Sequence, residues 1–378
     1  MKNQTRNSEL GTRKLIALAA VLVFAMTAPA FAQVRGEYLI TNHGAKGDGS
    51  FDNAPIINNL INNLPNTGGS IVIPHGDFRI AGNIVVRKSY VTIRGLGRGS
   101  KIIVGAGVGV GIDVPDDSPR LSGLTIRDLQ IAGTDWSVYQ TGILVNRAND
   151  GLHINNVHCS NLRKGMYLRA CDAGRVIGCT VLNCEGALHM QTGFQLVVSR
   201  SIFAGYSGGV AVEIQGLDRL QFTANVIEPD GYTSLWLHGV DNCNITGNTI
   251  TTWYTGAIIV EGNMNTLSSN NISAVLAGGA WLSDPRGRDG LYGLVRISGN
   301  DNVFATNTLM SWQPVNDVRT NVVSGDRNTL RDLTIAANGS NKKVQILTGA
   351  HDTRITHCGW ASETLIDNSP STRVTYDP

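Results

Sequence analysis

The chain has 378 residues, of which 31 are basic and 29 acidic, for a formal net charge of +2. This near-neutral balance, without a basic run, argues against nucleic acid or an anionic membrane as the main partner. A neutral ligand such as a sugar is compatible with it. The six cysteines leave two interpretations open, disulfides or small buried thiols.

The first 32 residues have the pattern of a secretory signal peptide. A basic head, Lys2 to Lys14, precedes the apolar stretch 15–26, which is too short to span a bilayer comfortably. Ala30 and Ala32 match a signal-peptidase site. We expect cleavage near Ala32 and a secreted or periplasmic protein, whose 27 basic and 28 acidic residues give a charge of −1.

Residues 33–69 are expected to form an N-terminal leading segment and a cap. Within them, the apolar residues of SFDNAPIINNLINNLP (50–65) have helical spacing. Because a β-solenoid needs its ends covered, we expect this short helix to cap the first coil. The flanking GAKGDGSFDNA and GGSIVIPHGDFRI resemble the start of many extracellular pectate-lyase-like β-helices.

From residue 70 to 360 the chain repeats one pattern every 22 to 25 residues, followed by a polar tail over 361–378. GVAVEIQGLDRLQFTANVI, SLWLHGVDNCNITGNTI and AIIVEGNMNTLSSNNI each alternate short apolar runs with Gly, Asn or Asp turns. Three short strands per repeat, without the fixed Leu spacing of leucine-rich repeats, are typical of a right-handed parallel β-helix. The predicted fold is therefore all-β, a right-handed parallel β-helix with a short N-terminal helical cap.

Positions that keep their residue type from repeat to repeat are expected to face the interior of the β-helix. Apolar residues two apart share one strand face and should stack into a core. These pairs are Ile143/Val145, Met166/Leu168, Leu188/Met190, Val210/Val212, Leu235/Leu237 and Ile258/Val260. One recurring turn position predicts a column of stacked amides, namely Asn225, Asn248, Asn270 and Asn307.

Positions whose residue type changes from repeat to repeat are expected to point outward from the same strand. One column is Asn146, Arg169, Gln191, Glu213, His238, Glu261 and Ser298. Two residues earlier, a second column is Leu144, Tyr167, His189, Ala211, Trp236, Ile259 and Arg296. An exposed sheet face is ordinarily polar, but exposed Tyr and Trp beside His and Glu favour a groove for sugar rings.

An insertion, GGAWLSDPRGRDGLYG (278–293), lengthens one repeat by about 14 residues. Long insertions on a regular solenoid tend to lie on its working face, so we expect this loop to wall the groove. Its chemistry-bearing residues are Trp281, Asp284, Arg286, Arg288, Asp289 and Tyr292.

Carboxylates on this face suggest acid–base chemistry. Glu213 and Glu261 lie two repeats apart, roughly 9–10 Å at the backbone, which suits an acid and a base on opposite sides of a sugar. A second acidic column lies at a turn, where Asp is favoured for structural reasons. Its members are Asp150, Asp172, Asp218, Asp241 and Asp301. Asp218 shares a repeat with Glu213 and is the candidate exception.

Residues 70–315 resemble the inulin fructotransferases and the related difructose-anhydride hydrolases. The resemblance is carried by PRLSGLTIRDLQIAG, SLWLHGVDNCNITGNTITTWYTG and GLYGLVRISGNDNVFATNTL. It implies a homotrimer with active sites at the subunit clefts, and no cofactor or metal. It also implies release of a cyclic difructose from inulin, as a hydroxyl of one fructose attacks the anomeric carbon of the next.

The family's acidic pair should fall within 205–218. By resemblance its Glu corresponds to Asp218, whereas its Asp corresponds to Ser207 or Gly208, where this chain has no carboxylate. Three alternatives follow from this. Glu213 or another acidic residue of the groove takes the place of the missing acid, or the substrate and the chemistry differ, or catalysis is lost. The predicted catalytic residues are Asp218 and Glu213, with Glu261 and His238 in reserve. The predicted substrate-binding residues are Tyr167, Arg169, His189, Gln191, Trp236, His238 and Glu261.

The resulting prediction is an enzyme that transfers a fructosyl unit of a fructan, releasing a difructose anhydride, or hydrolyses such an anhydride. Two alternatives stay open. One is a lyase, hydrolase or epimerase on another glycan, although polygalacturonase-like and alginate-epimerase signatures do not occur in the sequence. The other is a non-catalytic glycan-binding β-helix, which the missing acid favours.

Overall fold

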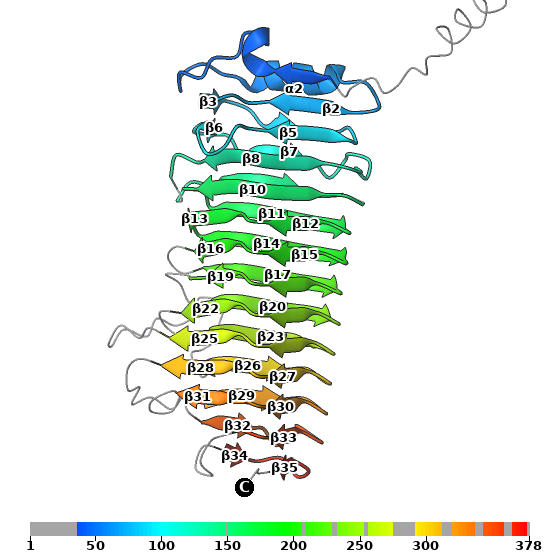
Figure 1. Ribbon diagram of the computed structural model, residues 1–378, viewed down its shortest axis with the longest axis vertical. Helices are drawn as coiled ribbons and strands as arrows, with labels where there is room; N and C mark the ends of the chain where they lie inside the picture. Colours follow the sequence, from blue (N-terminus) through cyan, green and yellow to red (C-terminus); the bar gives the residue numbers. More distant parts are fainter. Residues whose placement is uncertain are drawn as a thin grey trace, which may run out of the picture. The chain divides into compact units, whose positions relative to one another are not determined.

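The computed structural model describes residues 36–135, 137–148, 150–205, 209–228, 233–252, 256–274, 292–311, 320–336, 343–358 and 365–375. These residues form a parallel β-helix in which successive coils stack along one axis (Figure 1). The all-β, β-helical prediction is confirmed. The predicted signal peptide, Ser207, Gly208 and residues 278–291 of the predicted loop lie outside the described residues.

Three rows of parallel strands run along the stack, as expected for three strands per coil. One row forms a 12-stranded sheet, here sheet B. Its strands are β4 (Ile84–Val85), β7 (Val110–Val114), β9 (Thr141–Val145), β11 (Lys164–Asp172), β14 (Gly186–Phe194), β17 (Val210–Asp218), β20 (Thr233–Asp241), β23 (Ile258–Asn263), β26 (Tyr292–Ser298), β29 (Thr320–Ser324), β32 (Val344–Ile346) and β34 (Leu365–Asp367).

The other two rows belong to a 23-stranded sheet, here sheet A. The first row is β1 (Glu37–Leu39), β2 (Gly69–Val72), β5 (Val91–Arg94), β8 (Thr125–Ala132), β10 (His153–Ser160), β12 (Arg175–Ile177), β15 (Val197–Ser199), β18 (Gln221–Thr223), β21 (Asn244–Thr246), β24 (Thr266–Ser268), β27 (Val303–Ala305), β30 (Thr329–Arg331), β33 (Arg354–Thr356) and β35 (Arg373–Thr375). The second row joins β8 and β10 to β3 (Gly76–Ile80), β6 (Ser100–Val104), β13 (Thr180–Cys184), β16 (Ile202–Gly205), β19 (Val226–Ile227), β22 (Thr249–Thr252), β25 (Asn271–Ala274), β28 (Thr308–Ser311) and β31 (Thr334–Ala336).

The inside of the coils is a continuous apolar core. All the apolar pairs predicted to face inward are buried, and Phe78, Phe203 and Phe222 are the largest fully buried side chains among the described residues. All six cysteines are free, and five of them are buried. Burial raises the pKa of the Cys171 thiol to about 12. The buried-thiol interpretation is therefore confirmed over the disulfide one.

The predicted asparagine column exists as a hydrogen-bonded ladder. The Asn225 side-chain amide donates to Asn248 Oδ1 at 3.1 Å, and Asn248 donates to Asn270 Oδ1 at 2.9 Å. Asn270 donates in turn to Asn307 Oδ1 at 2.9 Å. Their buried amides are thereby satisfied by the neighbouring coils, which fixes the stacking register.

A short helix covers the N-terminal end of the stack (Figure 1). Helix α2 (Ala54–Asn63) follows the short 3-10 helix η1 (Ile40–His43) and buries Ile57, Leu60 and Ile61 against the first coils. No helix among the described residues is long and apolar enough to cross a membrane.

The stack is longer at both ends than the predicted range 70–360. Strand β1 already pairs with β2, so within the described residues the stack includes Glu37–Leu39. At the other end, β34 pairs with β32 and β35 pairs with β33, which extends the stack into residues 365–375 of the predicted tail.

Candidate functional site

Five consecutive strands of sheet B carry a polar and aromatic strip on their outer face. Each strand alternates inward apolar and outward side chains until it reaches a corner, and the outward side chains are polar or aromatic except Ile259, which is buried. The first outward column is Tyr167, His189, Glu213, Trp236 and Ile259. The second column, two residues further along each strand, is Arg169, Gln191, Gln215, His238 and Glu261. These ten residues are called the strip below.

The prediction placed Glu213 in the wrong outward column, and the observed register corrects it. Glu213 pairs with His189 and Trp236, not with Gln191 and His238, and Gln215 takes the predicted place of Glu213. Ala211, predicted to face outward, is buried. The reason is coil length, since Met166 pairs with Leu188, 22 residues later, whereas Leu188 pairs with Val212, 24 residues later. Aligning the repeats on their turn glycines does not reveal those additional residues.

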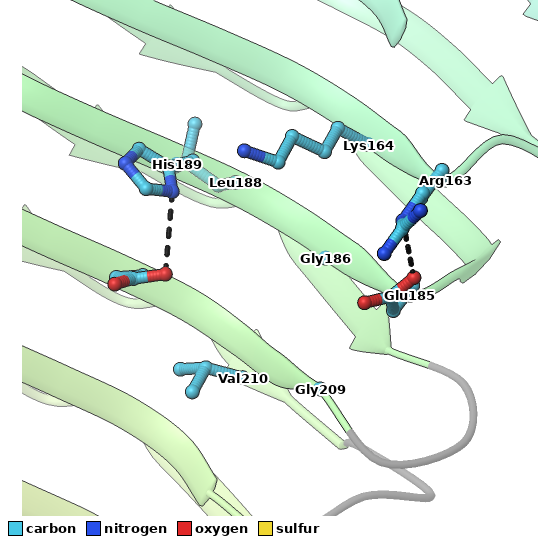
Figure 2. A pocket seen from close by; sticks show the side chains of 9 residues that line it. Arg163, Lys164, Glu185, Gly186, Leu188, His189, Gly209 and Val210 are labelled. Carbon is cyan, nitrogen blue, oxygen red and sulfur yellow. Dashed lines mark ion pairs between the residues drawn. The ribbon is translucent and has the colours of Figure 1, made fainter. Parts of the chain in front are cut away.

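A small pocket opens where β11, β14 and β17 begin (Figure 2). Arg163 Nε and Glu185 Oε2 form an ion pair at 2.7 Å on its rim. The ammonium group of Lys164 lies 4.5 Å from the centre of the Tyr167 ring. These charged residues stand at or just before the start of a strand, ahead of the outward columns, so the repeat pattern did not single them out.

His189 and Glu213 form the inner wall of this pocket. His189 Nδ1 lies 3.3 Å from Glu213 Oε2, and their side chains are only 16% and 19% exposed. The Tyr167 ring packs against His189, with centroids 4.4 Å apart and planes at 60°. The carboxylate of Glu213 is therefore held at the surface of the sheet, beside an imidazole and within reach of a bound ligand.

A hydrogen bond joins Tyr167 on β11 to Gln191 on the neighbouring strand β14. The Tyr167 hydroxyl donates to Gln191 Oε1 at 2.5 Å, which leaves the Gln191 amide hydrogens to other partners. Burial raises the pKa of the Tyr167 hydroxyl, and nearby Glu213 adds to this effect against the opposing charge of Arg169. Arg169 itself points toward Asp116, 3.7 Å from its carboxylate.

At the other end of the strip, Trp236, His238 and Glu261 form a second cluster. Glu261 Oε2 accepts from Trp236 Nε1 at 3.0 Å and lies 2.8 Å from His238 Nδ1. Burial opposes ionisation of Glu261, but the hydrogen bonds from His238 and Trp236 and the charge of Arg296 outweigh it and lower its pKa. This carboxylate is thus a fixed anion at neutral pH.

Asp218 does not join the strip. It lies on β17 beyond Gly216, whose φ of 60° turns the chain through a corner, as Ala170, Thr192 and Gly239 do on neighbouring strands. Its carboxylate accepts from the Asn242 amide at 2.9 Å and lies 3.8 Å from Arg219 Nε. The predicted pair of Asp218 and Glu213 is therefore separated by the corner at Gly216.

The other predicted site residues, Tyr167, Arg169, His189, Gln191, Glu213, Trp236, His238 and Glu261, share the strip. Their roles in binding or catalysis stay predictions.

A metal site is a separate question. The described part of the chain contains no group of three or more His, Cys, Asp or Glu side chains that could hold an ion.

Comparison with known families adds one match. The family model described as "Periplasmic copper-binding protein (NosD)" matches residues 125–329, which is more than half of the chain. No curated protein matches the sequence.

Solved structures with this fold include DFA-IIIase from Arthrobacter chlorophenolicus A6. Without its lid, that enzyme superimposes with a TM-score of 0.82 at 18% identity, over 91% of this chain and 99% of the other. Its complex with GF2 gives 0.81 at 19% identity, over 90% and 98%. Its complex with DFA-III gives 0.80 at 18% identity, over 90% and 98%. The family resemblance seen in the sequence thus extends to the fold.

Proposed function

This chain belongs to the NosD family, and we propose that it is a carbohydrate-active enzyme that acts on a fructosyl linkage. The substrate would be a fructan, cleaved with release of a difructose anhydride, or the anhydride itself, opened by water. The fold shared with DFA-IIIase, and the complexes of that enzyme with GF2 and DFA-III, support a saccharide ligand of this class.

The observation that carries the proposal is the adjacency of Glu213 and Trp236 on the strip. They are register partners on β17 and β20, so their backbones lie about 4.8 Å apart. An indole face beside a half-buried carboxyl is a suitable surface for a sugar ring whose glycosidic oxygen must be protonated.

In the proposed reaction, Glu213 protonates the departing glycosidic oxygen. The anomeric carbon is then attacked by a hydroxyl of the adjoining sugar or by water, and the proton of that hydroxyl passes to a second group of the strip. Tyr167 and Trp236 would stack on sugar rings, while Arg169, His189 and Gln191 would bind hydroxyls. Asp218 is left with a role in the turn, because its partners there are Asn242 and Arg219.

The remaining parts of the proposal concern the whole protein. Residues 1–32 would direct export to the periplasm or the medium, with cleavage near Ala32. The chain would assemble as a homotrimer, as the resemblance implies. No cofactor is part of this scheme.

Copper, named in the family description, does not fit the donors of the described residues. Copper sites in proteins use thiolate, thioether or imidazole ligands grouped around one point. His189 and His238 are each directed to a glutamate and lie on different columns. Five cysteines are buried in the core, where burial disfavours thiolates. No step of the proposed reaction therefore involves a metal.

The decisive experiment is to incubate the purified protein with inulin, levan and difructose anhydride III and to separate the products. Glu213→Gln is isosteric and should lower kcat by about 100-fold or more, because a general acid contributes 10²–10⁴-fold. Glu37→Gln, which alters an exposed carboxylate on β1, is the matched control and should leave kcat unchanged.

Two results would redirect the proposal. Turnover of another glycan, with none on fructans, would make the protein a lyase, hydrolase or epimerase of a different class. Glycan binding without any turnover would make it a binding β-helix. Full activity of Glu213→Gln would remove Glu213 from the chemistry.

A further inference from the structure

The cluster of Trp236, His238 and Glu261 determines which nitrogen of His238 carries a proton. The Nδ1 atom lies 2.8 Å from Glu261 Oε2, and an ionised carboxylate can only accept hydrogen bonds. Glu261 is ionised at neutral pH, since its pKa is lowered by His238, Trp236 and Arg296 in spite of burial. In the neutral imidazole the hydrogen is therefore on Nδ1, and Nε2 keeps its lone pair.

The exposure of the His238 side chain indicates that the lone pair of Nε2 can meet a ligand. Nε2 lies on the side of the ring away from Nδ1, and the His238 side chain is 47% exposed. The Trp236 indole flanks the imidazole, with ring centroids 5.2 Å apart and planes at 46°. A hydroxyl of a ligand resting on Trp236 would reach this nitrogen.

The position of His238 relative to Glu213 suits an acid and a base that act on one sugar. His238 stands one strand and two residues away from Glu213, which corresponds to about 8 Å between their backbones. Glu261 stands two strands and two residues away, about 12 Å. Acid and base groups flanking a glycosidic bond are roughly 6.5–9.5 Å apart when a nucleophile must fit between them. Side chains on backbones about 8 Å apart can reach this separation by small changes of direction, so His238 is better placed than Glu261.

We propose that His238, positioned by Glu261, is the proton acceptor of this site; the inference rests on the proposed fructosyl chemistry. The attacking hydroxyl gives its proton to His238 Nε2 while its oxygen bonds to the anomeric carbon. The bond from that carbon to the departing oxygen breaks with its electron pair, and this oxygen takes the proton of Glu213. The step leaves an imidazolium beside Glu261 and an ionised Glu213, and exchange with solvent restores both.

His189 is a poorer candidate for this task. Its Nδ1 lies 3.3 Å from Glu213 Oε2, and its side chain is only 16% exposed beneath the Tyr167 ring. It lies against the carboxylate of the acid itself, so it is placed to hold Glu213. The two His–Glu pairs of the strip thus have different tasks.

The charged groups that face His238 also fit the assignment. Its register partners are Gln215 on β17, which is neutral, and Glu261 on β23. Arg296, on β26, acts on Glu261. The carboxylate next to the ring stabilises the imidazolium that proton transfer creates.

The test uses His238→Asn in the full chain, with kcat, KM and rescue by added imidazole as readouts. Loss of the base should lower kcat by about 100-fold or more with little change in KM, and free imidazole should restore part of kcat through the exposed site. Glu261→Gln should reduce kcat less and gain nothing from imidazole, because the ring is still present. His153→Asn, exposed on β10 of sheet A, is the control and should match the wild type with and without imidazole.

Failure of this inference is distinct from failure of the proposed function. If the wild type turns over fructans and His238→Asn raises KM while keeping kcat, His238 only binds the sugar and the inference is wrong. A lowered kcat that imidazole does not restore, in a variant whose circular dichroism matches the wild type, also overturns it. A wild type inert on every fructan instead overturns the proposed function.

Discussion

The side chains of the strip are held by contacts within the protein before any ligand binds. Glu261 receives hydrogen bonds from two different side chains on one oxygen, and His189 and Tyr167 pack edge to face. These contacts already restrict the rotamers of the side chains in the free protein. Ligand binding therefore costs less side-chain conformational entropy. The strip is therefore a pre-organised surface.

The lowered pKa of Glu261 predicts how stability changes in acid. Because its folded-state pKa lies below the ordinary 4.5, ionised Glu261 stabilises the fold above that pH. This contribution should be lost as the pH falls through the folded-state pKa. The free energies of unfolding of the wild type and of Glu261→Gln, measured by urea denaturation, should differ most above pH 4.5 and converge in acid. A difference that grows on acidification would contradict the assignment.

Among the elements, the close approach of β20 and β23 depends on a glycine. A Cβ built on Gly262 would lie 1.9 Å from the Val240 carbonyl oxygen. This oxygen belongs to the backbone of β20, so it cannot move aside as the end of a flexible side chain could. Gly299, on the next coil, is in the same position relative to Gly262. The residue that follows Glu261 thus sets how near the carboxylate lies to His238.

Gly262→Ala should therefore push β23 away from β20. We expect a loss of about 1–3 kcal/mol in the free energy of unfolding, as for other overpacked sites, together with a fall in kcat as Glu261 moves. Gly82→Ala is the control, because no atom lies within 4 Å of the Cβ it would add. Equal stability of the two variants in guanidinium denaturation would show that the coil spacing is softer than inferred.

The whole molecule is a stack in which each coil contacts mainly its neighbours. Such architectures respond locally to damage, because stability is close to a sum over coils and interfaces. The helix α2 covers only the first coils, through Ile57, Leu60 and Ile61. Loss of this cap should open the N-terminal coils while the far end stays folded.

Ile57→Ala tests this locality. The side chain is fully buried, so its truncation should cost about 3 kcal/mol. Hydrogen–deuterium exchange should accelerate in β2 and β5 but not in β27 and β30. Ile56→Ala, on a half-buried neighbour, should have a smaller effect in the same region. Uniform acceleration along the chain would instead indicate one cooperative unit.

Much of this fold could be predicted because its rules are local and repeated. Inward pairs such as Met166/Leu168 follow from the two-residue period of a strand, and every repeat confirms the same choice. The Asn225–Asn307 ladder follows in the same way from one recurring turn. The helix over 50–65 was also predicted from its spacing, and the structure places it at 54–63.

By itself, the sequence determined the coils, their core and the outward position of Tyr167, His189, Trp236, His238 and Glu261. Only the tertiary structure decided which of them meet. The 24-residue step from Leu188 to Val212 moved Glu213 beside Trp236, and the corner at Gly216 separated Asp218 from it. Contacts between coils depend on turn length and on single left-handed residues, and a periodic pattern averages over both.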